Sequence, residues 1–189
     1  MNKKIEIEIP EGKVAEWKEI NGVTTLVLTD EVDNRPVTER IKTFEDACDE
    51  LGDEHPLVKE YWGVININLD IKQDLISYLK LRIICAALNE GWEPQFTNDE
   101  YRHYPWFYIY TQEDIDNMDE EKKKKLWLFG GGSGSGSNCG LACAASDADC
   151  SSSSGSARLA VKSEELAKYF GQQFIDIWSD YVVLPRNEE

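Results

Sequence analysis

The chain has 189 residues, of which 41% are hydrophobic and 11% aromatic, so it is not an intrinsically disordered protein and can form one domain or two small ones. Its 36 acidic and 20 basic residues give a net charge of −16, which disfavours nucleic acid and anionic membranes as partners. No apolar run approaches the roughly 18 residues of a spanning helix, so we expect no membrane insertion. Because the N-terminus lacks the apolar stretch of a secretory signal, we expect the protein to be made in the cytoplasm.

The first thirty residues predict β-structure. Residues 4–9 alternate isoleucine with charged residues, which is typical of a half-buried strand. Farther on, Asn21-Gly22 separates a run that ends at Ile20 from the run VTTLVL at 23–28. Asn-Gly suits the two-residue type I′ turn, so the sequence predicts a hairpin there.

Helices are predicted to follow. Thr43 and Asp46 have the spacing of a capping box, and Gly52 stands where a helix ends. Pro56 is expected to begin a second, short helix.

The longest predicted helix covers about residues 71–90, with Asp70 as its expected N-cap and Gly91 as its stop. Its apolar arc is wider than that of a surface helix, so we interpret it as the central core helix. Arg82 lies on the apolar face. We favour an arginine that reaches solvent at the edge of the core, and the alternative is a buried charge that faces a ligand.

An aromatic strand is predicted at residues 104–110. One of its faces carries four aromatic residues: Tyr104, Trp106, Tyr108 and Tyr110. Such a row could stack sugars or bases. Because Phe107 and Ile109 make the other face apolar as well, we favour a strand buried on both faces against the central helix.

Short elements are predicted up to the C-terminus. Thr111 and Asp114 are expected to cap a short helix, and Lys122–Lys125 to form a solvated turn of mixed charge. Residues 126–129 read as a strand. Ser163 is expected to cap a last helix that stops at Gly171, before a closing strand at 182–184.

These elements predict an α+β fold with N-terminal strands, a long central helix and a β-rich C-terminal region. We expect either an α+β region at 1–95 and a β-rich region at 96–189, or one single domain. No βαβ rhythm is present, so no dinucleotide-binding site of the Rossmann type is expected.

The sequence offers little for catalysis or metal binding. Its cysteines are Cys48, Cys85, Cys139, Cys143 and Cys150. An odd number in a reducing compartment disfavours a disulfide framework. A metal site at the C-x3-C pair 139 and 143 would need a further ligand at regular spacing, and His55 and His103 are far away in sequence. With no GxSxG motif and no base near a nucleophile, we expect a non-enzyme without cofactor or metal.

Residues 130–157, which we call the small-residue segment, have an unusual composition: seven Gly, nine Ser, five Ala and three Cys among 28 residues, and no aromatic residue. Three interpretations remain open. The segment is a flexible linker, a surface of small residues ordered for close packing, or a display surface whose residues are free to vary on a fixed scaffold.

A family resemblance bears on this choice. The stretches at 38–52, 76–96, 104–121 and 157–181 together resemble a family of uncharacterised proteins from gut bacteria, their phages and prophages. In that family the segment before the R-L-A-x-K-x-x-E-L-A block differs greatly between relatives. Some members resemble variable proteins of diversity-generating retroelements, which are ligand-binding proteins, usually of C-type-lectin-like fold. The resemblance thus implies a C-type-lectin-like C-terminal half and a phage virion as one location.

The genetic code is consistent with diversification. Mutation of the two adenines of an AAC codon cannot produce Lys, Glu, Gln, Met or Trp, and residues 130–157 contain none of these. Against this, binding faces usually carry aromatic or arginine anchors, which the segment lacks.

We therefore expect a non-enzymatic ligand-binding or display protein of phage or prophage origin, with an unknown protein or glycan as ligand and with homo-oligomerisation left open. The alternative is a phage structural or assembly protein in which 130–157 is a packed β surface. The residues expected on the variable face are Ser133, Ser135, Ser137, Asn138, Cys139, Ser146, Asp147, Asp149, Cys150, Ser151, Ser152, Ser153 and Ser154.

Overall fold

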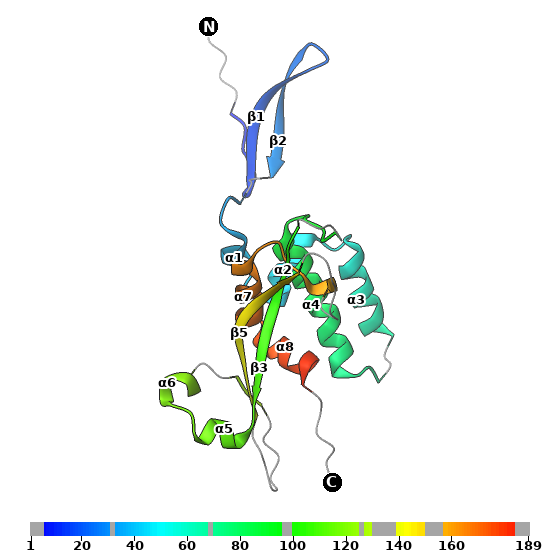
Figure 1. Ribbon diagram of the computed structural model, residues 1–189. Coiled ribbons are helices and arrows are strands. Elements are labelled where there is room, and N and C mark those ends of the chain that lie inside the picture. The colour runs from blue at the N-terminus through cyan, green and yellow to red at the C-terminus, as the bar shows by residue number, and fades with distance from the viewer. Residues whose placement is uncertain are drawn as a thin grey trace. The chain divides into compact units, whose positions relative to one another are not determined.

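The computed structural model describes residues 6–30, 33–67, 70–95, 100–124, 127–129, 139–149 and 157–183, with the backbone alone at Asp30, Gln112, 127–129, 139–149 and Ala157. The fold is mixed α+β (Figure 1). It divides into two compact units, Met1–Pro36 and Val37–Glu189.

The first unit contains the hairpin of β1 (Lys13–Ile20) and β2 (Val23–Asp30). Asn21 and Gly22 have φ values of 53° and 77°, the left-handed pair that a type I′ turn requires. The predicted hairpin is confirmed.

The strand predicted at 4–9 is wrong over its described part, because residues 6–10 have no regular secondary structure and Ile7 is 50% exposed. An alternating pattern yields a strand only where a neighbour takes its backbone hydrogen bonds. In the described part of this unit, β1 pairs with β2 alone.

The second unit begins with three helices: α1 (Val37–Arg40), α2 (Phe44–Leu51) and α3 (Pro56–Asn66). The predicted capping box of α2 is confirmed, since the Asp46 N–H donates to Thr43 Oγ1 at 3.1 Å and the Thr43 N–H donates back to Asp46 Oδ2 at 2.9 Å. Gly52 ends that helix with φ of 79°. Pro56 begins α3 as predicted.

Helix α4 (Gln73–Asn89) is the predicted central helix. Its buried residues include Leu81, Ile84 and Leu88, all fully enclosed. The N-cap is Lys72 rather than Asp70, so that prediction is wrong by two residues, a usual displacement at a helix end. At the other end, Glu90 is left-handed with φ of 49° and Gly91 follows with φ of 83°.

Arg82 lies at the edge of the core, which favours the first of its two interpretations. Its Nη1 is 2.9 Å from Glu60 Oε2 on α3, and its side chain is 24% exposed. The guanidinium also lies over the Tyr78 ring, 5.9 Å from the centroid.

Two further helices complete the core. Helix α7 (Glu164–Gln173) follows the 3-10 turn η1 (Ala157–Leu159), and α8 (Ile175–Val182) follows α7. Ser163 caps α7 as predicted, accepting from the Leu166 N–H at 3.2 Å. The predicted stop at Gly171 is wrong, because Gly171 is buried inside α7.

The closing strand predicted at 182–184 is also wrong where it is described. Val182 is the last residue of α8, and Val183 follows the helix. Phe174, Trp178 and Tyr181 are spaced by four and three residues, which puts them on one side of a helix. Phe174 and Trp178 are buried in the core, and Tyr181 packs against it.

Strands β3 (Arg102–Tyr110), β4 (Trp127–Phe129) and β5 (Cys139–Asp149) form an antiparallel sheet in the order β3-β5-β4. The short helices α5 (Gln112–Asp116) and α6 (Glu120–Lys123) lie beyond the end of β3 (Figure 1). The predicted capping of α5 by Thr111 and Asp114 is confirmed. Three i,i+3 ion pairs on α6 give the predicted turn of mixed charge.

One core spans the second unit. Helix α4 packs against α2 and α3, which precede it in the sequence, and against α8, which follows it. Elements from before and after residue 95 therefore share one core. The structure divides at Pro36, and the residues on both sides of residue 95 belong to one unit.

Asn89 joins the end of α4 to the segment before α7. The side chain is 4% exposed; its Nδ2 donates to Ala160 O at 2.9 Å, and its Oδ1 accepts from the Lys162 N–H at 3.1 Å. A buried polar group that loses its partner costs about 1–3 kcal/mol, so this side chain matters for stability.

We expect Asn89→Ala to lower the free energy of unfolding by about 1–3 kcal/mol. The substitution leaves the Lys162 amide without its partner and leaves the buried Ala160 carbonyl with the weak Cys85 thiol donor at 3.2 Å. Urea titration followed by circular dichroism measures the change. The control is Asn117→Ala, which removes an exposed bond to Glu113 O and should cost under about 0.5 kcal/mol. Equal effects of the two substitutions would contradict this role.

Candidate functional site

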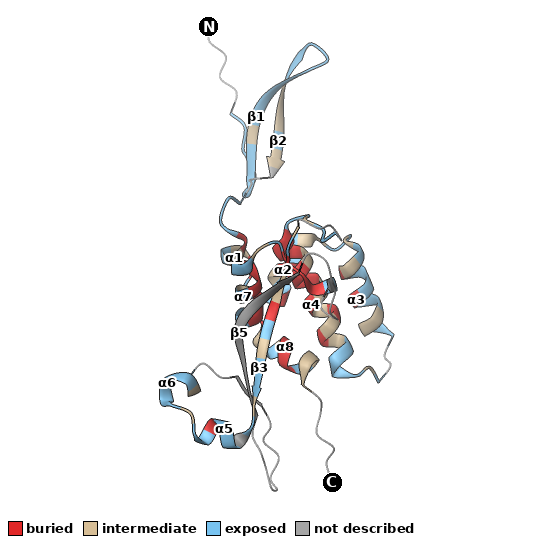
Figure 2. Ribbon diagram, viewed as in Figure 1, coloured by how far each residue is buried: buried red, intermediate tan, exposed pale blue. Residues whose placement is uncertain are grey.

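Strand β3 presents a row of aromatic side chains on one face. This row, which we call the aromatic row, consists of Tyr104, Trp106, Tyr108 and Tyr110. Trp106 is 48% and Tyr108 is 54% exposed, while the other two are half-buried. The Tyr108 and Tyr110 rings are neighbours, with centroids 6.1 Å apart. Figure 2 shows exposure increasing along β3 toward α5.

At Phe107 the opposite face of β3 rests on the helices, whereas Ile109 on that same face is 55% exposed. The Phe107 ring lies 5.2 Å from the Trp178 ring, and Trp178 lies 5.0 Å from Phe170, which is fully buried. Burial on both faces was therefore the wrong expectation. An apolar residue on each face does not require two buried faces, since folded proteins leave much apolar surface in solvent.

Strand β5 places part of the small-residue segment beside this row. Along the aromatic row, the register partners of Tyr104, Trp106, Tyr108 and Tyr110 are Asp147, Ala145, Ala142 and Gly140. Directly opposite residues of an antiparallel pair share a face of the sheet. Three of these four partners are glycine or alanine, so the neighbouring strand has no long side chain in those positions.

The expected face residues fall into three groups. Asp147 and Asp149 pair with Tyr104 and Arg102 in the register of the aromatic row. Ser146 pairs with Pro105, one position out of that register, and Cys139 pairs with Phe129 at the other edge of β5. The remaining predicted residues lie outside the described part of the chain: Ser133, Ser135, Ser137, Asn138, Cys150, Ser151, Ser152, Ser153 and Ser154.

The register of β3 and β5 shifts in the middle of the row. Trp106 pairs with Ala145 and Phe107 with Cys143, which leaves Ala144 as an extra residue on β5. This is a β-bulge, which increases the local twist and redirects side chains. It lies next to Trp106, at the centre of the candidate face.

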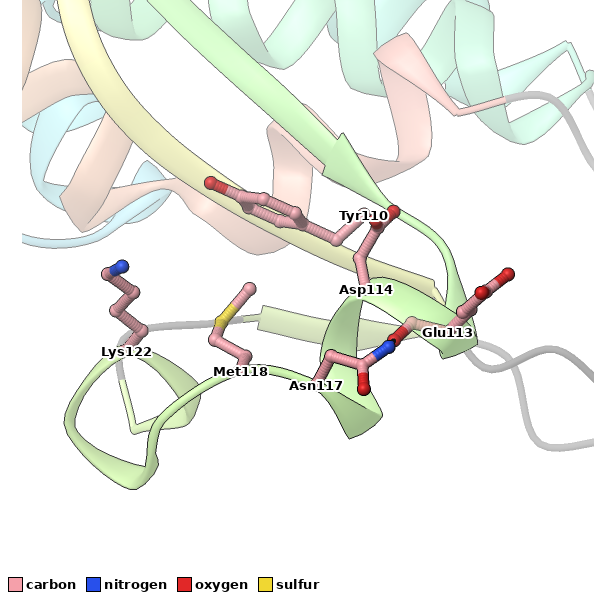
Figure 3. A pocket seen from close by; sticks show the side chains of 6 residues that line it. All are labelled: Tyr110, Glu113, Asp114, Asn117, Met118 and Lys122. Carbon is pink, nitrogen blue, oxygen red and sulfur yellow. Dashed lines mark hydrogen bonds between the residues drawn. The ribbon is translucent and has the colours of Figure 1, made fainter.

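An open hollow of about 400 Å³ lies at the α5 end of the row. It is lined by Tyr110, Glu113, Asp114, Asn117, Met118 and Lys122. In Figure 3 the Tyr110 ring, the Met118 thioether and the Lys122 side chain extend toward a common space. The hollow thus combines an aromatic ring with acidic, amide and ammonium groups, all of which can hydrogen-bond a polar ligand.

Asp114 has a structural role in that hollow. Hydrogen bonds from the Thr111 hydroxyl at 2.7 Å and the Thr111 N–H at 2.8 Å hold the pKa of the Asp114 carboxyl below its usual value. The carboxylate is therefore ionised at neutral pH and accepts these bonds. It is not suited to act as a general acid.

The thiols of Cys48 and Cys85 are not activated nucleophiles. Burial raises the pKa of the Cys85 thiol to about 12, and burial together with Glu45 raises the pKa of Cys48 to about 11. His55 Nδ1 accepts the Leu57 N–H at 3.3 Å as the N-cap of α3. Among the described residues, no three His, Cys, Asp or Glu side chains are grouped so as to hold a metal ion.

Comparison of the chain with family models, with curated proteins and with solved structures returns no match. None of the helices in the described ranges is long and apolar enough to cross a bilayer.

From the sequence we assigned the face to the small-residue segment and, of the two interpretations of the aromatic row, favoured burial over a stacking surface. The signal was present, because Tyr104, Trp106, Tyr108 and Tyr110 alternate with period two. What the sequence could not show is that β5 pairs with β3, since the pairing joins segments about forty residues apart.

We expect Cys48 and Cys85 to resist alkylation by iodoacetamide at pH 8. With pKa values of about 11 and 12, only about one thiol in a thousand or fewer is ionised there, and the thiolate is the reactive form. Mass spectrometry after partial labelling maps the sites. The same protein in urea is the control, and rapid labelling of Cys85 in the folded protein would contradict the buried environment.

Proposed function

We propose that this chain is a non-enzymatic ligand-binding or display protein whose binding face combines the aromatic row with the small-residue segment. The observation that carries the proposal is the exposure of Trp106 and Tyr108, at 48% and 54%, in direct register with the small residues of β5. Tryptophan and tyrosine supply much of the binding energy at protein interfaces.

The arrangement supplies the anchors that the small-residue segment lacks. The rigid aromatic side chains come from β3, which the core holds from the other side through Phe107. The adjacent positions on β5 belong to glycine and alanine, residues that leave room for a flat ligand over the rings. Aromatic rings stack on the apolar faces of sugars and on peptide side chains, so the proposed ligand is a glycan or a peptide segment.

Diversification of the segment is the second part of the proposal, and the family resemblance supports it. If it holds, mutation changes residues 130–157 while the aromatic anchors of β3 stay fixed. Sequencing of the genomic neighbourhood tests this part. Absence of both a reverse transcriptase gene and a near-identical template repeat would remove diversification and leave the binding face untouched.

One observation favours the alternative, a phage structural or assembly protein. Residues 139–149 form the middle strand of the sheet, between β3 and β4, so this part of the segment is ordered β-structure in the way that a packed β surface requires. In that case the aromatic face would contact another subunit of the assembly. Purified glycans and peptides would then not bind to it.

We expect Trp106→Ala combined with Tyr108→Ala to weaken binding by about tenfold or more, because two exposed aromatic anchors are lost. Wild-type protein is first screened against a printed glycan array and a library of random twelve-residue peptides. The affinity of each variant for the hits is then measured by biolayer interferometry.

The matched control is Trp62→Ala on α3. Trp62 is 47% exposed, so this substitution removes a tryptophan of equal exposure from outside the sheet and should leave affinity unchanged. Equal loss in the control and the double variant would contradict a binding face on β3. An empty array and library would favour the assembly alternative.

A further inference from the structure

The N-terminal hairpin exposes large apolar side chains on both of its faces. Trp17 is 67% and Leu28 44% exposed on one face, while Val23 is 62% and Ile20 47% exposed on the other. Within the described residues of this unit, β1 and β2 form a sheet of only two strands. Two strands are marginally stable in water, and a third strand or a packed partner is usually needed.

The two strands differ as edges. Strand β1 carries four charged residues: Lys13, Glu16, Lys18 and Glu19. Residues 23–29 of β2, VTTLVLT, carry none. Proteins protect free edges with charges, prolines or bulges. By this criterion β1 is protected against strand addition and β2 is not.

The register decides which backbone groups of β2 are available. In a hairpin with a two-residue turn, the flanking residues, here Ile20 and Val23, exchange both of their backbone hydrogen bonds. The bonding direction alternates along the strand, so Thr24, Leu26 and Leu28 direct their N–H and C=O groups away from β1. These three residues define what we call the β2 edge.

We propose that two copies of this chain associate by antiparallel pairing of their β2 edges about a two-fold axis at Leu26. Leu26 then lies opposite Leu26 of the other copy, and Thr24 lies opposite Leu28 in both directions. All three residues of each edge fall in hydrogen-bonded positions. The product is a four-stranded sheet in the order β1-β2-β2-β1.

A second copy fits this edge because the edge is complementary to itself. The two-fold axis brings the smaller Thr24 against the larger Leu28 on either side of the axis, which is the reciprocity of an isologous dimer. The pairing also joins the apolar positions Trp17, Leu26 and Leu28 of each copy into one continuous face, since residues 17 and 26 are register partners. The uncharged edge avoids repulsion at the contact although each chain has a net charge of −16.

Two double variants of full-length protein test the register. Thr24→Lys with Leu28→Lys puts like charges opposite each other twice in the dimer, whereas Thr24→Lys with Leu28→Glu puts opposite charges there. Both variants remove the same two side chains. We expect the lysine–lysine variant to dimerise about tenfold or more weakly than the lysine–glutamate variant, because directly opposite like charges destabilise a strand pair and opposite charges stabilise it.

Sedimentation equilibrium over about 1 to 100 µM measures these dissociation constants, since dimerisation follows mass action. Wild-type protein should be dimeric at the upper end, and its dimer should strengthen as salt rises because the two acidic chains are screened from each other. Circular dichroism melting should show the helices of both variants unchanged.

Three outcomes would overturn the proposal. A wild-type protein that is monomeric at about 100 µM has no such interface. Equal dissociation constants for the two double variants would exclude the antiparallel register centred on Leu26. A dimer that survives the lysine–lysine variant undiminished would place the interface elsewhere on the chain.

Discussion

The contact between Phe107 and Trp178 attaches the sheet to the helical core. Trp178 packs in turn on the fully buried Phe170, and β3 is also bonded at its other end, where His103 and Val161 exchange backbone hydrogen bonds of 3.1 and 2.7 Å. Strand β5 depends on this attachment. Strand β5 is hydrogen-bonded on both of its edges, to β3 and to β4, and it also packs against α7 and α8.

The same attachment determines which face of the sheet is available. The side of β3 that carries Phe107 is used by the core, so the aromatic row is on the side that remains. The proposed binding face therefore joins a rigid strand, anchored by large side chains, to a strand of small residues whose order does not require particular side chains. The hydrogen bonds that pair β5 with β3 and β4 come from the backbone, so they do not depend on which side chains β5 carries.

Local signals in the sequence predicted the elements with unambiguous end groups. The Asn21-Gly22 turn and the capping boxes at Thr43 and Thr111 are confirmed because each depends on residues within three or four positions. The strand at 4–9 and the closing strand at 182–184 were wrong over their described residues. An apolar run reveals neither whether a partner strand exists nor whether the run continues a helix, as it does at Val182. The same limit explains the division expected at residue 95, since the packing of α4 on α8 joins residues about a hundred positions apart.

For the candidate site, the sequence pointed to both the small-residue segment and the aromatic row, but it did not show that the two lie side by side on one face of the sheet. It selected the small-residue segment as a face and described the aromatic row as buried, because the pairing of β3 with β5 and the bulge at Ala144 are tertiary features. A flexible linker was also left open for the whole segment. The central position of β5 in the sheet opposes that interpretation for residues 139–149.

The central claim is that residues 139–149 form an ordered strand paired with β3. Amide hydrogen exchange of these residues, measured by mass spectrometry or NMR, tests it most directly. If β5 is the middle strand of the sheet, its amides should exchange far more slowly than in an unstructured peptide of the same sequence, and about as slowly as those of β3, because the two strands open together. Exchange at the rate of the unstructured peptide, with β3 still protected, would contradict the pairing of β5 with β3. The small-residue segment would then be a flexible linker.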